Sequence, residues 1–175
     1  SRPAQLFVSA GSHGRLNAQA TAGGVTASGL DGLVTVESNN WDGYRDHSSE
    51  DSNGVYANTG WQLGGGSESR LSASYLNSDQ KLPGALTRAQ YDADPDQASA
   101  AAQGGDYQKN LDTWRLANKT HLALANDSFL EFGVSWEEQS LYHPIVDKVL
   151  VDFDGPGPAP PTEVFSLLVD TDHRD

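Results

Sequence analysis

The sequence Ser69-Arg-Leu-Ser-Ala-Ser-Tyr-Leu76 decides the fold, because its side chains alternate in character. Leu71, Ala73 and Tyr75 point to one side of an extended backbone, whereas the intervening serines point to the other. This period of two predicts a β-strand with one apolar and one polar face. The strand leads into a connection that we expect to last until about Asn110, far longer than the usual ~4 to 6 residues. Connections of that length are usually functional or disordered.

The same alternation recurs along the chain. We expect further strands at residues 4–10, 16–22, 33–37, 55–63, 114–122, 130–137 and 164–170. The sharpest pattern is that of Leu130, Phe132, Val134 and Trp136, which alternate with polar residues or glycine. Asn118 is an exception, because it falls on the otherwise apolar face of its strand.

The connections between these strands fall into two groups. Short connections are expected near residues 23–32, 63–69 and 125–128, and long connections near residues 38–53, 77–110 and 139–162. Trp61, Tyr75, Trp114 and Trp136 lie on apolar faces, where an interfacial aromatic girdle would place them. The sequence therefore predicts an all-β fold: an antiparallel, up-and-down transmembrane β-barrel segment of about eight strands, with short periplasmic turns and long extracellular loops.

Composition narrows the class of protein. The 175 residues carry a net charge of −13, which argues against nucleic acid and anionic membrane surfaces as partners. Cysteine is absent, so neither a disulfide framework nor a thiolate metal site can form. No run of ~18 apolar residues and no signal-peptide pattern is visible. We expect that a leader has been removed or that the chain is an internal piece of a longer one.

Charged and amide side chains on the polar faces also favour a barrel with a water-filled lumen. Burying these side chains in a sealed core would cost free energy unless they were paired, but the cost is small when they face a water-filled lumen. The residues are Glu131, Glu137, Arg115, Lys119 and Gln62. A soluble β-sandwich with polar residues facing outward is the alternative, because alternation alone does not distinguish lipid from a protein core.

Three segments strengthen the membrane interpretation. The segment that begins Asn77-Ser-Asp-Gln-Lys-Leu-Pro-Gly84 and ends at Ala98 resembles the third extracellular loop of TonB-dependent outer-membrane receptors, especially the ferric-siderophore branch. Asn39-Asn-Trp-Asp-Gly-Tyr-Arg-Asp-His-Ser48 is similar to the preceding loop, and Tyr142-His-Pro-Ile145 to the start of the next.

The resemblance implies that residues 1–175 are part of the barrel domain of such a receptor. A whole receptor has a plug domain, a TonB-contacting segment and 22 strands, and this chain resembles roughly the first eight barrel strands. The expected function is to help bind and import a ferric siderophore or similar metal complex in the outer membrane of a Gram-negative bacterium. The expected partners are the metal complex, outer-membrane lipid and, through a plug that is absent here, TonB.

Candidate ligand-binding residues lie on the predicted long loops. In this receptor class, loop and inner-wall Arg, Tyr and His contact the iron complex, and guanidinium groups suit citrate-like or other anionic ligands. The corresponding residues are Arg45, His47, Arg88, Tyr91, Tyr107, Tyr142 and His143. A solvated or loop-stapling role is the alternative for each of them.

Other chemistry finds less support in the sequence. Asp92, Asp94 and Asp96 have a spacing that can hold calcium, as do Asp152 and Asp154. However, the glycine and distal glutamate of an EF-hand loop are missing, which favours a solvated acidic loop. No catalytic motif is present, so we do not expect an enzyme.

Two alternative functions remain open. One is a complete small barrel of eight strands with a structural or adhesin role, which requires that the first and last strands pair. The other is a soluble secreted β-sandwich that binds calcium or glycan.

Overall fold

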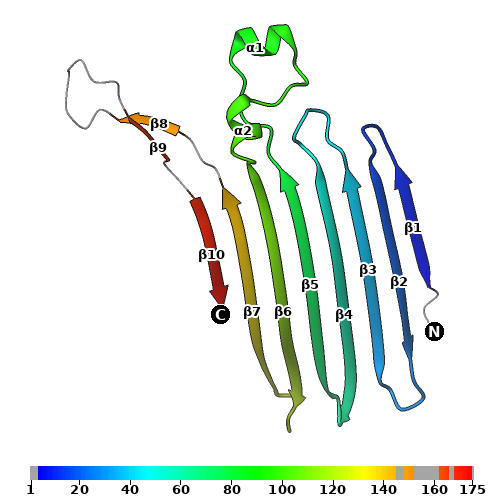
Figure 1. Ribbon diagram of the computed structural model, residues 1–175. Helices are drawn as coiled ribbons and strands as arrows, with labels where there is room; N and C mark the ends of the chain where they lie inside the picture. Colours follow the sequence, from blue (N-terminus) through cyan, green and yellow to red (C-terminus); the bar gives the residue numbers. More distant parts are fainter. Residues whose placement is uncertain (1–3, 145–147, 152–161, 166–167, 175) are drawn as a thin grey trace.

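The computed structural model describes residues 4–144, 148–151, 162–165 and 168–174 (Figure 1). The central feature is one antiparallel sheet of eight strands in the order β1-β2-β3-β4-β5-β6-β7-β10. These strands are β1 (Gln5–Ala10), β2 (Leu16–Val25), β3 (Asp31–Trp41), β4 (Glu50–Gly64), β5 (Ser67–Lys81), β6 (Gln108–Ala123), β7 (Phe129–Pro144) and β10 (Leu168–Arg174). The predicted all-β, up-and-down antiparallel arrangement is confirmed.

Smaller elements complete the described part of the chain. Strands β8 (Lys148–Val151) and β9 (Thr162–Phe165) pair with each other in a separate two-stranded sheet. Helices α1 (Arg88–Ala93) and α2 (Ala100–Gly104) lie in the connection between β5 and β6 (Figure 1). Neither is long and apolar enough to cross a membrane, and no other helix occurs among the described residues.

The large sheet is open. β1 and β10 form its two edges and do not pair with each other. A complete eight-stranded barrel required this pairing, so that alternative is wrong for the described residues. The predicted eighth strand at 164–170 falls partly on β9 and partly on β10, and only β10 joins the large sheet, beside β7.

The strand register divides the sheet into two faces. On one face, Val36 pairs with Val55, Val55 with Tyr75, and Tyr75 with Trp114. Leu116 then pairs with Trp136 on the same face. We call this side the belt face and the opposite side the polar face. The apolar belt comprises Leu6, Val8, Ala18, Ala20, Ala22, Val34, Val36, Val55, Ala57, Trp61, Leu71, Ala73, Tyr75, Trp114, Leu116, Leu122, Leu130, Phe132, Val134 and Trp136.

The belt is not covered by a second layer of described residues. Leu130, Phe132, Val134 and Trp136 are 50%, 51%, 70% and 43% exposed. The buried hydrophobic residues in the described part are Ala98, Ala102 and Tyr107, all between β5 and β6 rather than against the belt. A β-sandwich would bury the row on β7 against a second sheet, so that alternative does not describe this fold.

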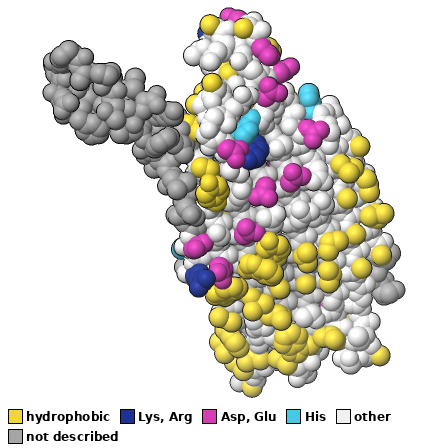
Figure 2. All heavy atoms as spheres, in the orientation of Figure 1, with side chains coloured by type: hydrophobic (Ala, Val, Ile, Leu, Met, Phe, Trp, Pro, Cys, Tyr) yellow, Lys and Arg dark blue, Asp and Glu magenta, His cyan; other side chains and the backbone are white. Residues whose placement is uncertain are grey.

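The belt face changes character along its strands. Above the belt, at the end that carries the two helices, the same face presents the polar residues Ser38, Asn40, Asp51, Asn53, Asn77, Asp79, Asp112 and Glu138. Figure 2 shows hydrophobic side chains gathered over the lower part of the sheet and acidic side chains above them. Tyr75 and Trp114 pack at this boundary with ring centroids 4.3 Å apart and ring planes tilted by 32°, and the Tyr75 hydroxyl donates to Asp112 over 2.8 Å. An aromatic side chain that combines an apolar ring with a hydrated polar group is typical of a membrane–water interface.

Asn118, the polar exception within the belt, is satisfied locally. Its amide nitrogen donates to Ser69 Oγ over 3.0 Å and to the Arg70 carbonyl over 3.2 Å. Its amide oxygen accepts from Thr120 Oγ1 over 3.0 Å, and the Ser69 and Thr120 hydroxyls lie 2.8 Å apart. The three side chains form a closed polar cluster that can lie within an apolar belt without unpaired donors.

The strands extend further than the sequence predicts. The expected loops at 38–53 and 77–110 shorten to 42–49 and 82–107. The polar extensions of β3 and β4 stay paired, and the Asn39 side chain donates to Ser52 Oγ over 3.3 Å. The expected loop that begins at Gln139 is likewise shorter, because β7 continues to Pro144. Ladder hydrogen bonds and cross-strand side-chain pairs therefore outweigh the low strand propensity of these polar segments.

The predicted difference between the two ends of the sheet holds for the described connections after β2. The first connection, residues 11–15 between β1 and β2, is a short turn that lies at the same end as the long ones. Residues 26–30, 65–66 and 124–128 connect strands at one end, and residues 42–49 and 82–107 do so at the other. The tightest connection needs Gly64, Gly65 and Gly66, whose φ angles of 89°, 60° and 86° lie in the left-handed region that favours glycine.

Candidate functional site

The loop end of the sheet carries a folded platform made of residues 42–49 and 82–107. Arg45 joins the two segments, because its guanidinium donates to backbone carbonyls of the longer one. Nε and Nη2 reach the Gln97 oxygen over 3.1 and 2.9 Å, Nη1 reaches Gly84 over 3.0 Å, and Nη2 also reaches Pro83 over 3.4 Å. The predicted ligand-binding residue Arg45 therefore lies in the loop-stapling position that was its alternative.

The local turn holds Arg45 in place. The Arg45 backbone N–H donates to Ser48 Oγ over 3.1 Å, and the buried Ser48 hydroxyl donates back to the Arg45 carbonyl over 2.5 Å. Gly43 has a φ of 83°, and a Cβ built at this position would lie 1.9 Å from Ser48 Oγ. A side chain at position 43 would therefore displace the turn that presents Arg45.

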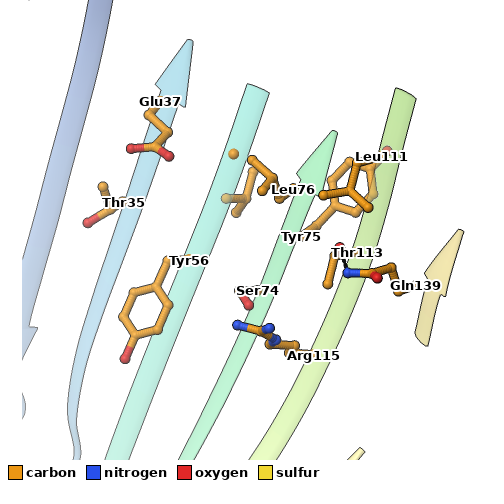
Figure 3. A pocket seen from close by; sticks show the side chains of 12 residues that line it. Thr35, Glu37, Tyr56, Ser74, Tyr75, Leu76, Leu111, Thr113, Arg115 and Gln139 are labelled. Carbon is orange, nitrogen blue, oxygen red and sulfur yellow. Dashed lines mark hydrogen bonds between the residues drawn. The ribbon is translucent and has the colours of Figure 1, made fainter. Parts of the chain in front are cut away.

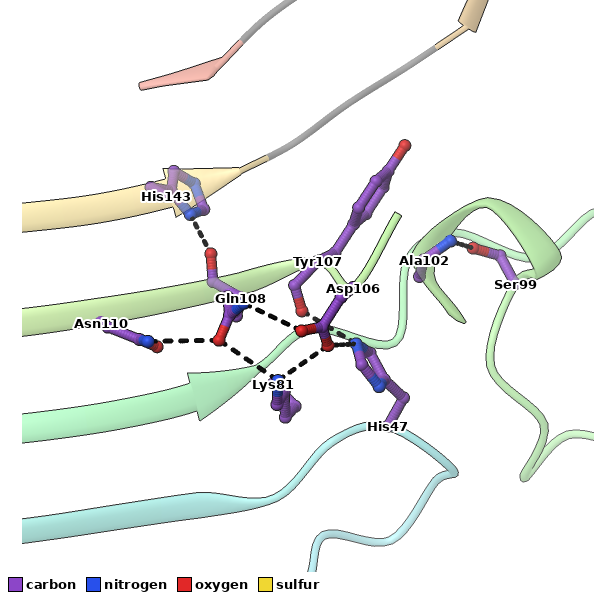
Figure 4. Close-up of polar contacts among 9 residues, drawn as sticks. All are labelled: His47, Lys81, Ser99, Ala102, Asp106, Tyr107, Gln108, Asn110 and His143. Carbon is purple, nitrogen blue, oxygen red and sulfur yellow. Dashed lines mark hydrogen bonds and ion pairs between the residues drawn. The ribbon is translucent and has the colours of Figure 1, made fainter. Parts of the chain in front are cut away.

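A second set of contacts anchors the end of the longer segment (Figure 4). His47 Nε2 lies 3.0 Å from the Tyr107 carbonyl and 3.5 Å from Asp106 Oδ1. Lys81 Nζ donates to Asp106 Oδ1 over 2.7 Å and to Gln108 Oε1 over 3.2 Å. The hydrogen bond from Lys81 lowers the pKa of the Asp106 carboxyl from its ordinary value, partly opposed by burial. His47 adds a smaller effect in the same direction as Lys81.

The polar face contains a depression of about 310 Å³ (Figure 3). Glu37 on β3, Tyr56 on β4 and Arg115 on β6 contribute polar groups to it, and Gln139 on β7 donates to Thr113 Oγ1 over 3.4 Å. Arg115 is paired through Nε with Glu137 Oε2. The depression is thus a polar concavity in the wall of the sheet.

A smaller pocket of about 250 Å³ lies at the loop end, and we call it the rim pocket. Its lining includes Arg15, Asn39, Trp41 and Glu50. The Arg15 guanidinium carbon lies 5.6 Å from the Trp41 ring centroid, and Tyr44 lies 6.2 Å from the same ring. An aromatic ring flanked by a carboxylate and amides can recognise a cation or a partly apolar polar ligand.

The structure brings some of the predicted site residues together and separates others. Arg45, His47 and Tyr107 meet in the platform, and His143 joins their edge because its Nδ1 lies 2.7 Å from the Gln108 carbonyl (Figure 4). Tyr107 is 6% exposed and forms part of the small loop core. Arg45, His47 and Tyr107 therefore organise the platform.

The remaining predicted residues lie apart from this group. Arg88 and Tyr91 are on α1, where Arg88 pairs with Asp92 over 2.9 Å and lies 5.9 Å from the Tyr91 ring centroid. Tyr142 is 41% exposed on the belt face near the upper end of β7. Tyr91 is 54% exposed on α1 and remains an accessible predicted ligand contact, whereas Tyr142 points to the side of the apolar belt and not to the polar face.

The predicted calcium site gains no support. Within the described residues, no group of three or more His, Asp or Glu side chains is arranged to hold a metal ion. Asp92 is paired with Arg88, and Asp94 Oδ1 accepts from the Asp96 backbone N–H over 3.0 Å, as in an Asx turn. Asp152 and Asp154 lie outside the described residues.

Sequence reasoning missed the residues whose role depends on register. Glu37 and Tyr56 were not candidates, and neither were Trp41 and Glu50 of the rim pocket. Each lies in or beside a segment whose sequence is typical of a polar loop or of an ordinary strand. The signal that could have found them is the cross-strand pairing itself, which places Glu37 opposite Gly54 and Trp41 opposite Glu50.

The chain was compared with models of protein families and with curated proteins. No family model matches the chain, and no curated protein is similar to it. The likeness of its loops to TonB-dependent receptors therefore stays a prediction.

Proposed function

We propose that this chain forms a sector of the wall of an outer-membrane, TonB-dependent receptor that binds and imports a ferric siderophore or similar metal complex. One observation carries the membrane part of the proposal. A single sheet exposes a continuous apolar belt on one face and charged side chains on the other, with no second layer of described residues.

The belt has dimensions that suit a bilayer. On β6 it runs from Trp114 to Leu122, and transmembrane β-strands need about 9–11 residues. At about 3.4 Å per residue this segment is roughly 27 Å long along the strand. Tyr75 and Trp114 form the upper margin of the belt, and Trp61 lies towards the lower margin. Contact with hydrocarbon would remove the free-energy cost of exposing these apolar side chains to water.

The polar face suits the lumen of a barrel. Arg70 pairs with Asp31 over 2.9 Å, Lys119 with Glu131 over 3.0 Å, and Arg115 with Glu137. These pairs keep partial exposure to solvent, so their desolvation cost is small. The unpaired edges at β1 and β10 supply places where further strands of a larger barrel would join.

The receptor part of the proposal rests on the loops. Residues 77–98 and 39–48 resemble receptor loops, and these two segments include the parts that fold together through Arg45 above the belt. A folded, polar platform at the loop end of a barrel sector is where an extracellular ligand would first be bound.

Iron uptake tests this function directly. Cells that lack the receptor carrying this chain should lose energy-dependent uptake of at least one ferric siderophore, and the wild-type gene should restore it. A variant lacking residues 88–104 should reach the outer membrane but not restore uptake. Normal uptake of every ferric complex by the deletion strain would contradict the proposal.

A further inference from the structure

The platform carries a protruding segment, residues 85–96, which we call the flap. Figure 1 shows its helix α1 standing clear of the large sheet. Within the described chain, every hydrogen bond of residues 85–95 stays inside the segment 85–97. The flap carries Arg88 and Tyr91, two of the predicted ligand contacts. Its position therefore depends on how its two ends are held.

Arg45 holds both ends of the flap. Its guanidinium donates to the Gly84 carbonyl, immediately before the flap, over 3.0 Å. The same group donates to the Gln97 carbonyl, immediately after the flap, over 3.1 and 2.9 Å. The Gln97 side chain in turn donates to the carbonyls of Gln90 and Asp94 over 2.8 and 2.9 Å, so the end of α1 is tied to the point that Arg45 grips.

The segment that contains Arg45 begins against the turn between β1 and β2, residues 11–15. The Asp42 backbone N–H donates to the His13 carbonyl over 3.0 Å. Gly14 has a φ of 66°, and a Cβ built at this position would overlap the Asp42 carboxylate. The Asp42 side chain therefore lies directly against the turn, in space that is open only because residue 14 is glycine.

The short segment from Asp42 to Arg45 is stiff. The hydroxyl of Ser48 bonds both the N–H and the carbonyl of Arg45, and Gly43 leaves no room for a side chain beside Ser48. Only two residues separate the contact with the turn from the guanidinium that grips the flap. A shift of Asp42 therefore moves Arg45, because a packed and hydrogen-bonded segment transmits a displacement.

We propose that residues 42–45 act as a lever that positions the flap, and that the turn of residues 11–15 sets this lever. Displacement of the turn loosens the grip of Arg45 on the flap. A ligand that moves the flap shifts the turn, because coupling between two sites is reciprocal. Gly14 and Asp42 are thus positioning residues, which act on the flap through Arg45. The proposal rests on the proposed function only in treating Arg88 and Tyr91 as ligand contacts.

Hydrogen exchange of the intact receptor in lipid vesicles tests the first direction. Gly14→Ala should speed amide exchange in residues 82–107 about fivefold, because the added methyl group displaces Asp42. Gly65→Ala is the matched control, since Gly65 has a similar φ of 60° at the opposite end of the sheet and open space around it. Equal changes in the two variants, or no change in Gly14→Ala, would overturn the lever. The measurement needs no ligand, so that result would leave the receptor function standing.

Removal of the Asp42 carboxylate tests the route of the coupling. In an Asp42→Ala background the methyl group added at position 14 no longer meets a carboxylate. Gly14→Ala should then have no further effect on exchange in residues 82–107, as a double-mutant cycle would show. The same fivefold increase in both backgrounds would mean that the effect bypasses Asp42, and the proposal would be wrong.

The reverse direction is tested without changing the glycine of the turn. The chain contributes no native cysteine, so Ser12→Cys allows a nitroxide label to report on residues 11–15. Arg45→Lys should make this label more mobile, because the lever is no longer held at the flap. Arg88→Lys, which changes a side chain of the flap but not its grip, should leave the label unchanged. Unchanged mobility in Arg45→Lys, or an equal increase in both variants, would contradict the coupling.

Discussion

Replacement of Val134 by arginine tests the orientation of the sheet. Val134 is 70% exposed at the centre of the β7 row, between Phe132 and Trp136. If this row faces hydrocarbon, Val134→Arg places a guanidinium near the middle of the bilayer at a cost of about 2–4 kcal/mol. Because about 1.4 kcal/mol is a tenfold change in an equilibrium constant, the folded-to-unfolded ratio should fall about 30- to 700-fold.

The next residue provides the matched control. Ser135 lies on the polar face opposite Ala117, with Arg115 and Glu137 further along that face. Ser135→Arg introduces the same side chain one position away, into an aqueous lumen, and should change stability by less than about 0.5 kcal/mol. Urea unfolding of the receptor in lipid vesicles measures both values, and outer-membrane abundance gives an independent readout. Equal tolerance of the two variants, or greater damage from Ser135→Arg, would refute the orientation.

Three further predictions concern the belt, the platform and its pH dependence. Asn118→Ala should lower stability in vesicles by about 1 kcal/mol, because it removes the centre of the closed polar cluster. An unchanged urea midpoint would mean that the cluster contributes nothing. Arg45→Lys should speed amide hydrogen exchange in residues 82–107 about 30-fold, because at least about 2 kcal/mol of carbonyl contacts is lost. Arg88→Lys, on exposed α1, should leave exchange unchanged, and the same loosening in both variants would argue against Arg45 as the staple. The lowered pKa of Asp106 means that its carboxylate stabilises the platform above the ordinary Asp pKa, and that this contribution disappears as the pH falls through the lowered value. Exchange in residues 82–107, corrected for the intrinsic pH effect, should therefore rise in acid for the wild type but not for Asp106→Asn. A parallel rise in both proteins would assign the effect to another group.

Much of the sheet could be predicted from the sequence, since alternation reports directly on which side chains share a face. The row from Leu130 to Trp136 and the segment from Leu71 to Tyr75 are strands with the predicted orientation. The polar extensions of β3 and β4 were not predicted, because alternation is the only signal that was used to find strands. Ser38 to Asn40 have no apolar alternation, and only their pairing with Asp51 to Asn53 makes them strand.

Less of the site could be predicted, because residue type does not reveal which partner a side chain has. Arg45 and Arg88 look equally suited to an anionic ligand in the sequence. In the structure one is engaged with loop carbonyls and the other with Asp92. Their engagement depends on how residues 82–107 fold back over residues 42–49, which no local pattern encodes. The rim pocket was missed because Arg15, Trp41 and Glu50 come from three different connections or strand ends.

The most direct test of the membrane orientation is a spin-label scan along residues 130–137 of the receptor in lipid vesicles. The chain contributes no native cysteine, so single cysteines can be introduced and labelled one at a time. Labels at 130, 132, 134 and 136 should be accessible to oxygen dissolved in lipid, and labels at 131, 133, 135 and 137 to a water-soluble nickel chelate. Loss of this two-residue period, or its appearance with the opposite phase, would contradict a wall with lipid on one face and water on the other.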